Sequence, residues 1–295
     1  MNQRKLNVDI AGSITELEAM LKEFRLKKII YKLFFRGKGL EFDGYRDFAP
    51  DDDAERIDWK ATARAQKTLV KQYIEERDLR IMFMIDIGDN MVFGSTDKIK
   101  CEFITELVAA FSKVMLNTDD RIGFVLFSST ITHFVDCKSG EKQFQIFVDT
   151  LSNGINYGGV SNLDQALDFS IDYFDNSISA VILVSDFLRI TEETEKKLSL
   201  LSHRFETIAI RVRDPLDITL PDIEGEIILE NPEANQQVIV NPKIAKRTYE
   251  KYAFEQGKIV EVMFRKSELD YLDLITDRSF AEPLVIFLKE RIEGR

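Results

Sequence analysis

From residue 80 onward, short apolar runs alternate with longer stretches in which apolar residues recur every three or four positions. Runs of this length are typical of buried strands, and the longer stretches have the period of helices that cover a sheet. The pattern therefore predicts an α/β fold with a mostly parallel sheet flanked by helices. The expected strands are residues 80–86, 121–127, 131–135, 180–185, 207–212 and 259–264.

The segment 131–135 follows the preceding run too closely for a crossover helix, so we expect it to pair antiparallel with that run as a hairpin arm. The longer stretches between the other runs have apolar residues at helical spacing. The first of these helices is expected to begin at Asp97, because aspartate is a common cap. The expected helices are residues 97–116, 161–174 and 192–203.

A further helix is expected near the N-terminus. The sequence Ser13-Ile-Thr-Glu16 matches a capping box, and apolar residues recur at helical spacing from there. They are Ile14, Leu17, Leu21, Phe24 and Ile29. Residues 37–58 are rich in Gly, Asp, Arg and aromatic residues, which favours a structured loop or short strands. Residues 69–74 are then expected to form a strand.

The chain is expected to contain two regions. Residues 1–78 would hold the N-terminal helix and a β region, and residues 79–295 would form the α/β domain. An interruption at about residues 215–241 contains two strand-like segments, 226–229 and 237–240, that are expected to form a hairpin. We expect this hairpin to pair with the N-terminal region, giving a small β module that is discontinuous in sequence.

Composition limits the classes of partner. Of the 295 residues, 44% are hydrophobic, which is enough for a sizeable core. The formal net charge of −11 comes from intermixed acidic and basic residues, which disfavours nucleic acid and anionic membrane surfaces as partners. The two cysteines form no ligand motif, and no apolar run has the length of a signal peptide or a membrane span. We therefore expect a cytoplasmic protein with no membrane insertion.

Three parts of the sequence carry a recognisable set of motifs. The first runs from Gly37 to Arg64, the second is Asp86-Ile-Gly-Asp-Asn-Met91, and the third joins Gly158-Gly-Val-Ser-Asn-Leu163, Val184-Ser-Asp186 and Arg213-Asp-Pro215. From about residue 16 to the C-terminus, the chain resembles the family known as domain of unknown function 58. Members of that family have a von Willebrand factor A-like domain and are commonly encoded beside MoxR-type AAA+ ATPases.

The resemblance implies a von Willebrand factor A-like, Rossmann-like fold and a role in protein assembly, remodelling or maturation. A MoxR-type AAA+ ATPase would supply the energy, and this chain would contact the protein client as a non-enzymatic, chaperone-like adaptor. Likeness of fold sets the class of function and leaves the client unidentified.

Asp86 and Asp186 each stand at the end of an expected buried strand, and Ser161 lies in a Gly-rich loop that leads into a helix. Loops at the carboxyl ends of parallel strands meet in one crevice, so we expect these side chains to lie close together. Their oxygens, with that of Asn90, are the type of ligand that Mg²⁺ takes. The set resembles the metal-ion-dependent adhesion site, in which a partner's carboxylate completes the coordination of the metal.

The sequence departs from the usual Asp-x-Ser-x-Ser motif of that site. Gly88 and Asn90 hold the two serine positions, and Ser161 stands where a threonine is usual, so the motif is degenerate. An alternative is that Asp86 and Asp186 only organise turns by accepting backbone N–H groups. A depleted magnesium site and a metal-free crevice are both open at this stage.

The segment between Gly37 and Arg64 packs charges around aromatic residues. It contains five candidate interaction residues: Arg46, Arg56, Asp58, Trp59 and Arg64. Arg and Trp are enriched where partners make energetically important contacts, which favours a recognition surface. The alternative is an internal ion-pair network in which an arginine holds Asp58 and Trp59 covers the junction with the α/β domain.

Other kinds of chemistry find little support in the sequence. Gly37-Lys-Gly39 lacks the spacing of a phosphate-binding loop, so we expect no nucleotide. Neither His133 nor His203 lies near a nucleophile motif. The leading hypothesis is the non-enzymatic adaptor. The alternatives are a Mg²⁺-dependent hydrolase that uses Asp86 and Asp186, and a metal-free structural scaffold.

Overall fold

The computed structural model describes residues 5–21, 41–49, 57–65, 67–74, 79–231 and 236–293. The chain divides into two compact units, a larger one formed by residues 1–34 and 79–295 and a smaller one formed by residues 35–78. Phe24, Ile29 and Arg56, which the sequence analysis singled out, lie outside the described residues.

The centre of the larger unit is a six-stranded sheet in the order β10-β7-β6-β3-β4-β5. All neighbouring strands are parallel except β4 and β5, which pair antiparallel. The strands are β3 (Arg80–Asp86), β4 (Arg121–Phe127), β5 (Ile131–Lys138), β6 (Ala180–Ser185), β7 (Glu206–Arg213) and β10 (Asp270–Ile275). The expected α/β class, the mostly parallel sheet and the antiparallel hairpin arm are thus confirmed.

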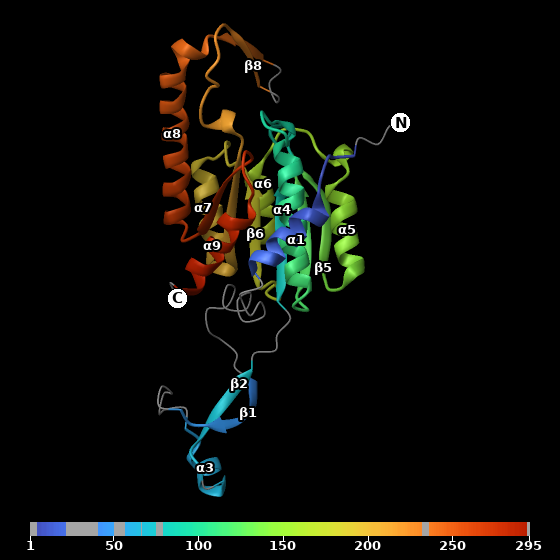
Figure 1. Cartoon of the computed structure of the whole chain (residues 1–295), viewed down its shortest axis with the longest axis vertical. Helices are drawn as coiled ribbons and strands as arrows, with labels where there is room; N and C mark the ends of the chain where they lie inside the picture. Colours follow the sequence, from blue (N-terminus) through green and yellow to red (C-terminus); the bar gives the residue numbers. More distant parts are fainter. Residues whose placement is uncertain are drawn as a thin grey trace. The chain divides into compact units, whose positions relative to one another are not determined.

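Helices cover both faces of this sheet (Figure 1). One face carries α1 (Ile10–Leu21), α4 (Lys100–Leu116), α5 (Glu141–Leu151) and α9 (Ala281–Glu293), and the other carries α6 (Leu163–Tyr173), α7 (Glu192–Arg204) and α8 (Pro242–Lys266). A short 3-10 helix, η3 (Gly154–Asn156), follows α5.

Alternate residues of the central strand β3 explain why both faces are covered. The Phe83 ring lies 6.2 Å from that of Phe111 in α4 and 6.0 Å from that of Phe147 in α5. Met82 and Met84 belong instead to a buried cluster formed with α6, α7 and α8. Because successive side chains of a strand point to opposite faces, an unbroken apolar run can only be buried between two helical layers.

One expected strand was wrong. Residues 259–264 lie within the 25-residue helix α8, and the strand at that edge of the sheet is β10. Val260, Met263 and Phe264 are buried, which is the i, i+3, i+4 spacing of one helix face. A short apolar run fits a strand or a buried helix face equally well, so periodicity could not separate the two.

Two helix starts also differ from expectation. The helix α4 begins at Lys100, and its N-cap residue is Ile99 rather than Asp97. The Ile99 N–H donates a hydrogen bond to Glu102 Oε2 at 3.3 Å. The helix α1 begins at Ile10, three residues before the expected Ser13, and Asp9 Oδ1 accepts a hydrogen bond from the Gly12 N–H at 3.0 Å. The sequence analysis grouped α1 with the N-terminal region, whereas it packs against α4 and α9 of the larger unit.

Two small antiparallel sheets complete the described strands. In the smaller unit β1 (Glu41–Asp47) pairs with β2 (Leu69–Ile74), beside the helix α3 (Trp59–Ala65). In the larger unit β8 (Ile227–Asn231) and β9 (Gln236–Val240) form the expected hairpin. Among the described strands these are separate two-stranded sheets, and the expected pairing of the hairpin with the N-terminal region stays a prediction.

Candidate functional site

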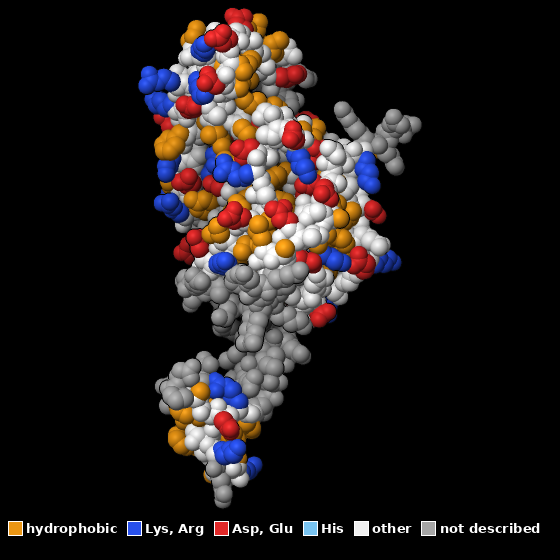
Figure 2. Space-filling model, viewed as in Figure 1, with side chains coloured by type: hydrophobic (Ala, Val, Ile, Leu, Met, Phe, Trp, Pro, Cys, Tyr) orange, Lys and Arg blue, Asp and Glu red, His pale blue; other side chains and the backbone are white. Residues whose placement is uncertain are grey.

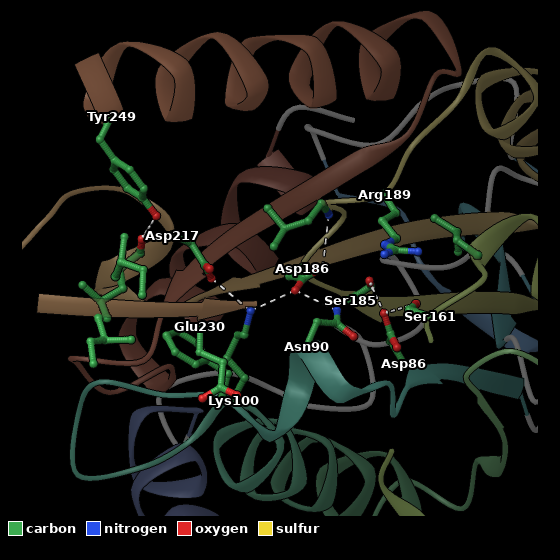
Figure 3. A pocket seen from close by; sticks show the side chains of 16 residues that line it. Asp86, Asn90, Lys100, Ser161, Ser185, Asp186, Arg189, Asp217, Glu230 and Tyr249 are labelled. Atoms are coloured by element: carbon green, nitrogen blue, oxygen red, sulfur yellow. Dashed lines mark hydrogen bonds and ion pairs between the residues drawn. The ribbon is translucent and has the colours of Figure 1, made fainter. Parts of the chain in front are cut away.

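The candidate site lies where the strand order reverses. From β3 the chain moves to β4 and β5 on one side, then returns to β6 on the other side of β3. Loops that leave parallel strands at such a point diverge and leave a crevice at the carboxyl ends. Here the crevice has a volume of about 730 Å³. Figure 3 labels its polar lining: Asp86, Asn90, Lys100, Ser161, Ser185, Asp186, Arg189, Asp217, Glu230 and Tyr249.

Asp86, the last residue of β3, is buried and accepts hydrogen bonds from uncharged donors. Its Oδ1 accepts from the Gly88 N–H at 2.9 Å, and its Oδ2 accepts from the hydroxyls of Ser161 and Ser185, each at 2.8 Å. Burial and the nearby Asp186 carboxylate raise the pKa of Asp86 to about 6, against the opposing effect of these hydrogen bonds. We call Asp86, Gly88, Ser161 and Ser185 the Asp86 cluster.

Asp186, directly after β6, is also buried, but a charged donor holds it. Its Oδ2 accepts from Asn90 Nδ2 and from the Lys100 ammonium, both at 2.8 Å, and its Oδ1 accepts from the Leu188 N–H at 3.1 Å. Asn90 lies in the short 3-10 helix η2 (Asp89–Val92) that follows β3. Asp186, Asn90 and Lys100, together with Asp217, form the Asp186 cluster.

Lys100 connects this cluster to the loop after β7. Its ammonium also donates to Asp217 Oδ2 at 3.1 Å, and Asp217 lies in the 3-10 helix η4 (Pro215–Asp217). Burial lowers the pKa of Lys100, but the charges of Asp186 and Asp217 outweigh it and leave the pKa raised. Burial raises the pKa of Asp217, against the effect of Lys100. Figure 3 shows the ammonium between the two carboxylates.

Backbone contacts of a glycine loop bring Ser161 to Asp86. The Gly158 N–H donates to the Ile87 carbonyl at 2.7 Å, and the Asp89 N–H donates to the Gly159 carbonyl at 2.8 Å. Gly158 and Gly159 have φ values of 140° and 87°, which residues with a side chain rarely adopt. The glycines that the sequence displays before Ser161 are therefore required by the path of the loop.

A further buried aspartate, Asp214, joins the loop after β7 to two other loops. Asp214 Oδ2 accepts the Ser95 N–H at 2.7 Å and the Thr276 hydroxyl at 3.3 Å, and its Oδ1 accepts the Leu216 N–H at 2.9 Å. Asp214 belongs to the Arg213-Asp-Pro215 motif, and these contacts give that motif a structural role. It fixes the segment from which Asp217 reaches Lys100.

The four expected metal ligands, Asp86, Asn90, Ser161 and Asp186, all line the crevice. Both oxygens of each carboxylate already accept hydrogen bonds, and one donor to Asp186 is a cation. Asn90 Oδ1 is buried and has no donor among the described residues, so one amide oxygen is open to a ligand.

This donor set does not fit a Mg²⁺ site that uses both aspartates. A metal on Asp186 would have to displace the Lys100 ammonium or lie beside it, and Mg²⁺ demands several oxygens in near-octahedral geometry. Gly88 adds no ligand, and a Cβ built there would lie 2.5 Å from Asn90 Oδ1, so a serine would not fit without movement. Within the described residues no group of three or more His, Cys, Asp and Glu side chains is arranged to hold a metal ion.

Apolar side chains surround the polar base of the crevice. Phe93 and Leu188 come from loops, Leu163 begins α6 and Leu216 lies in η4. The strand β8 contributes Ile228 and Leu229 together with Glu230. The Tyr249 hydroxyl of α8 donates to the Leu216 carbonyl and links this helix to the loop after β7. The wall therefore has contributions from both the segments that follow the strand ends and the hairpin inserted after β7.

In the smaller unit, the interaction candidate Asp58 has a local structural role. Asp58 Oδ1 accepts the N–H groups of Lys60 and Ala61 at 3.0 and 3.1 Å, so Asp58 caps α3. Its Oδ2 accepts the Tyr45 hydroxyl at 3.0 Å. The Trp59 side chain is 69% exposed rather than packed. Arg46 and Arg64 are also exposed, so a recognition role for these three residues stays a prediction.

The sequence analysis missed three residues of the Asp86 and Asp186 clusters. Ser185 stands inside a quoted motif but was given no role, whereas Lys100 and Asp217 stand outside the quoted motifs. Lys100 and Asp186 are 86 positions apart with several elements between them, and no local spacing encodes their contact. A lysine in the first turn of a helix is unusual because it opposes the helix dipole, and that was the one available clue.

No helix among the described residues is both long enough and apolar enough to cross a bilayer.

Two of the most similar relatives are the uncharacterized protein Rv1480 of Mycobacterium tuberculosis and the uncharacterized protein Mb1516 of Mycobacterium bovis. Each is 24% identical over 262 residues, which cover 88% of this chain and 81% of the relative.

Among solved structures, similarity is found to the conserved hypothetical protein BatB from Bacteroides thetaiotaomicron. The match has 10% identity, covers 74% of this chain and 100% of that chain, and has a TM-score of 0.45. A von Willebrand factor type A protein from Catenulispora acidiphila matches with 13% identity and a TM-score of 0.38, covering 77% of this chain and 44% of that chain. The family model described as "Protein of unknown function DUF58" matches residues 44–259, and the chain therefore belongs to the DUF58 family.

Proposed function

We propose that this chain is a non-enzymatic protein-interaction adaptor that works with a MoxR-type AAA+ ATPase in protein assembly, remodelling or maturation. The observation that carries the proposal is the crevice at the carboxyl ends of β3 and β6. Its buried carboxylates are held by fixed donors, and its wall is apolar. A concave site with a few fixed polar groups and apolar walls is suited to receive a segment of a partner.

The two cysteines and the two histidines of the chain are placed unfavourably for catalysis. Burial raises the pKa of Cys101 and of Cys137 to about 12, so neither thiol ionises near neutral pH. His133 Nδ1 lies 3.2 Å from the hydroxyl of the adjacent Thr132 on the edge strand β5, and His203 Nδ1 contacts the Ser199 carbonyl. Neither histidine lines the crevice.

Exposed apolar side chains beside the crevice support an interaction role. In the hairpin Ile228, Val238 and Ile239 are 64%, 58% and 67% exposed, and on α8 Tyr252 and Phe254 are 65% and 66% exposed. Figure 2 shows hydrophobic side chains at the end of the larger unit where β8 and α8 lie. Exposed apolar groups near one another mark interaction sites more often than single ones do.

The charge of the crevice favours a cationic side chain of the partner. Four acidic residues line it, Asp86, Asp186, Asp217 and Glu230, against two basic ones, Lys100 and Arg189. Burial first, and the neighbouring Asp186 carboxylate second, raise the pKa of Asp86. The acidic partner group that the adhesion-site resemblance implies would need a metal to offset this charge, so we propose a lysine or arginine in an apolar segment instead.

The test uses the full chain and the purified MoxR-type ATPase, with association measured by sedimentation velocity. Glu230→Lys reverses a charge on the rim of the crevice, and Glu226→Lys makes the same change at an exposed position near the start of the hairpin that does not line it. We expect Glu230→Lys to weaken binding, added salt to do the same, and Glu226→Lys to leave binding unchanged.

Equal binding by both variants would show that the crevice is not part of the interface, and no binding by the wild type would count against the ATPase as partner.

The alternative function, a Mg²⁺-dependent hydrolase, is tested in the same preparation with p-nitrophenyl phosphate. Turnover that needs Mg²⁺ and is lost in Asp86→Asn would replace the adaptor with that enzyme.

A further inference from the structure

Lys100 is placed where a lysine is electrostatically disfavoured. It is the first residue of the 17-residue helix α4, at the positive end of the helix dipole, and it is only 1% exposed. An ammonium that is removed from water and set at a helix N-terminus requires strong local compensation. The reason for its presence must lie in the groups around it.

Those groups are the side chains of the crevice. The ammonium lies 2.8 Å from Asp186 Oδ2 and 3.1 Å from Asp217 Oδ2, and its position over the Phe93 ring, at 5.8 Å from the centroid, adds a cation–π contact. Asp186 and Asp217 come from the loops after β6 and β7. A single positive charge therefore joins two neighbouring loops and the start of a helix at the base of the crevice.

A divalent cation would make the same kind of connection, because it would also neutralise carboxylates from adjacent strand ends and tie their loops together. Asp186, which the sequence analysis assigned as a metal ligand, has its Oδ2 directed to Lys100 and Asn90 instead. Two cations could not share Asp186 without strong repulsion at this depth.

We propose that the Lys100 ammonium is the built-in cation of this crevice, standing in place of a bound metal ion, so that the crevice is assembled without metal. This inference is independent of the proposed adaptor function, because it concerns how the crevice is held and not what enters it. It also accounts for Gly88 and Asn90 at the two serine positions, since a site without a metal needs no hydroxyl ligands there.

The experiment measures Mn²⁺ binding to the full chain by electron paramagnetic resonance of free Mn²⁺, with Mg²⁺ titration calorimetry beside it. We expect the wild type to show no saturable binding that depends on Asp86. Lys100→Ala should bind Mn²⁺ at least about tenfold more tightly than the wild type, because removal of a positive charge a few ångströms away favours a cation. Lys100→Arg retains the charge and should resemble the wild type.

Because Lys100→Ala leaves two carboxylates buried without their cation, we expect it to be unstable, and a second measurement is paired with it. Thermal unfolding of this variant is followed with and without Mn²⁺ and with ethylammonium, which replaces the missing amine. Rescue by either cation is expected. Saturable Mn²⁺ binding to the wild type that is lost in Asp86→Asn would overturn the proposal, and so would a folded Lys100→Ala with no gain in Mn²⁺ affinity.

Discussion

The Asp86 and Asp186 clusters show how one residue type at the ends of neighbouring strands can have different roles. Asp86 is the last residue of β3, Asp186 directly follows the neighbouring parallel strand β6, and both side chains are buried. Asp86 is held by a backbone N–H and two serine hydroxyls, whereas Asp186 is held by an asparagine amide and a lysine. Burial and the charge of Asp186 raise the pKa of Asp86 to about 6, and its uncharged donors do not fully offset this. Asp186, in contrast, has the opposite charge of Lys100 beside it.

The difference indicates a division of labour within the crevice. The Asp186 cluster ties loops together through charge, and its lysine is committed to two carboxylates. The Asp86 cluster carries the unbalanced negative charge and lies next to Asn90 Oδ1, a buried amide oxygen that has no donor among the described residues. A cationic partner group would therefore gain more from the Asp86 cluster than from the Asp186 cluster.

The largest expected effect comes from breaking the Asp186 cluster. Lys100→Ala leaves two carboxylates buried without their cation, and we expect the free energy of unfolding to fall by about 3–5 kcal/mol. The measurement is urea denaturation at pH 7, with the change in midpoint compared at constant slope. In the double variant with Asp186→Asn, part of the loss should be recovered, because one unpaired charge is gone. A fall in the free energy of unfolding of less than about 1 kcal/mol would show that the ion pair of Lys100 and Asp186 does not stabilise the fold.

The Asp86 cluster should show itself as a pH dependence of stability. The folded-state pKa of Asp86, about 6, is above its ordinary value of 3.8, so protonation favours the folded state. The stabilisation is complete below pH 3.8 and is lost as the pH rises to about 6; two units of pKa correspond to about 3 kcal/mol. Asp86→Asn should remove this component, measured as the difference between the two denaturation profiles from pH 4 to 8. Parallel profiles would contradict the burial argument.

Restoring the usual serine at position 88 tests whether this loop can hold a ligand. A Cβ at Gly88 would lie 2.5 Å from Asn90 Oδ1 and 2.9 Å from Ser161 Cβ, so we expect Gly88→Ser to cost about 1–3 kcal/mol through overpacking. Gly225→Ser is no suitable control because its φ is 103°, but Gly257→Ser in α8, where an added Cβ would meet no atom closer than 4.0 Å, is a matched control. A stable Gly88→Ser variant that gains Mg²⁺ binding would reverse this interpretation of the motif.

The smallest expected effect is the loss of one hydroxyl from the Asp86 cluster. Ser185→Ala removes one of two hydroxyl donors to Asp86 Oδ2, and a hydrogen bond to a charged group contributes about 1.5–3 kcal/mol. The remaining Ser161 hydroxyl places the expected loss near the lower end of that range. The pKa of Asp86, followed by the pH profile, should rise further, because the hydroxyl stabilises the charged form. An unchanged profile would mean that Ser185 is not a donor to Asp86.

The positions of Asp86 and Asp186 could be predicted because each follows an apolar run long enough for a buried strand. The Gly-rich loop before Ser161 was equally visible, since positive φ values require glycine there. The error at residues 259–264 has the opposite cause: an apolar run in an otherwise polar helix is locally indistinguishable from an edge strand. Its assignment depended on packing against α7 and β10.

The sequence by itself determined the α/β class, most strands of the sheet and the meeting of Asp86, Asn90, Ser161 and Asp186 in one crevice. Hydrophobic period and the place of a residue at the end of an apolar run are local properties of the chain, and the convergence of strand ends follows from the geometry of parallel sheets. Only the tertiary structure decided that Lys100 and Asp217 complete the crevice, that Asp58 caps a helix and that α1 joins the larger unit. Ion pairs between distant residues depend on where whole elements pack, and no periodicity in the sequence records that.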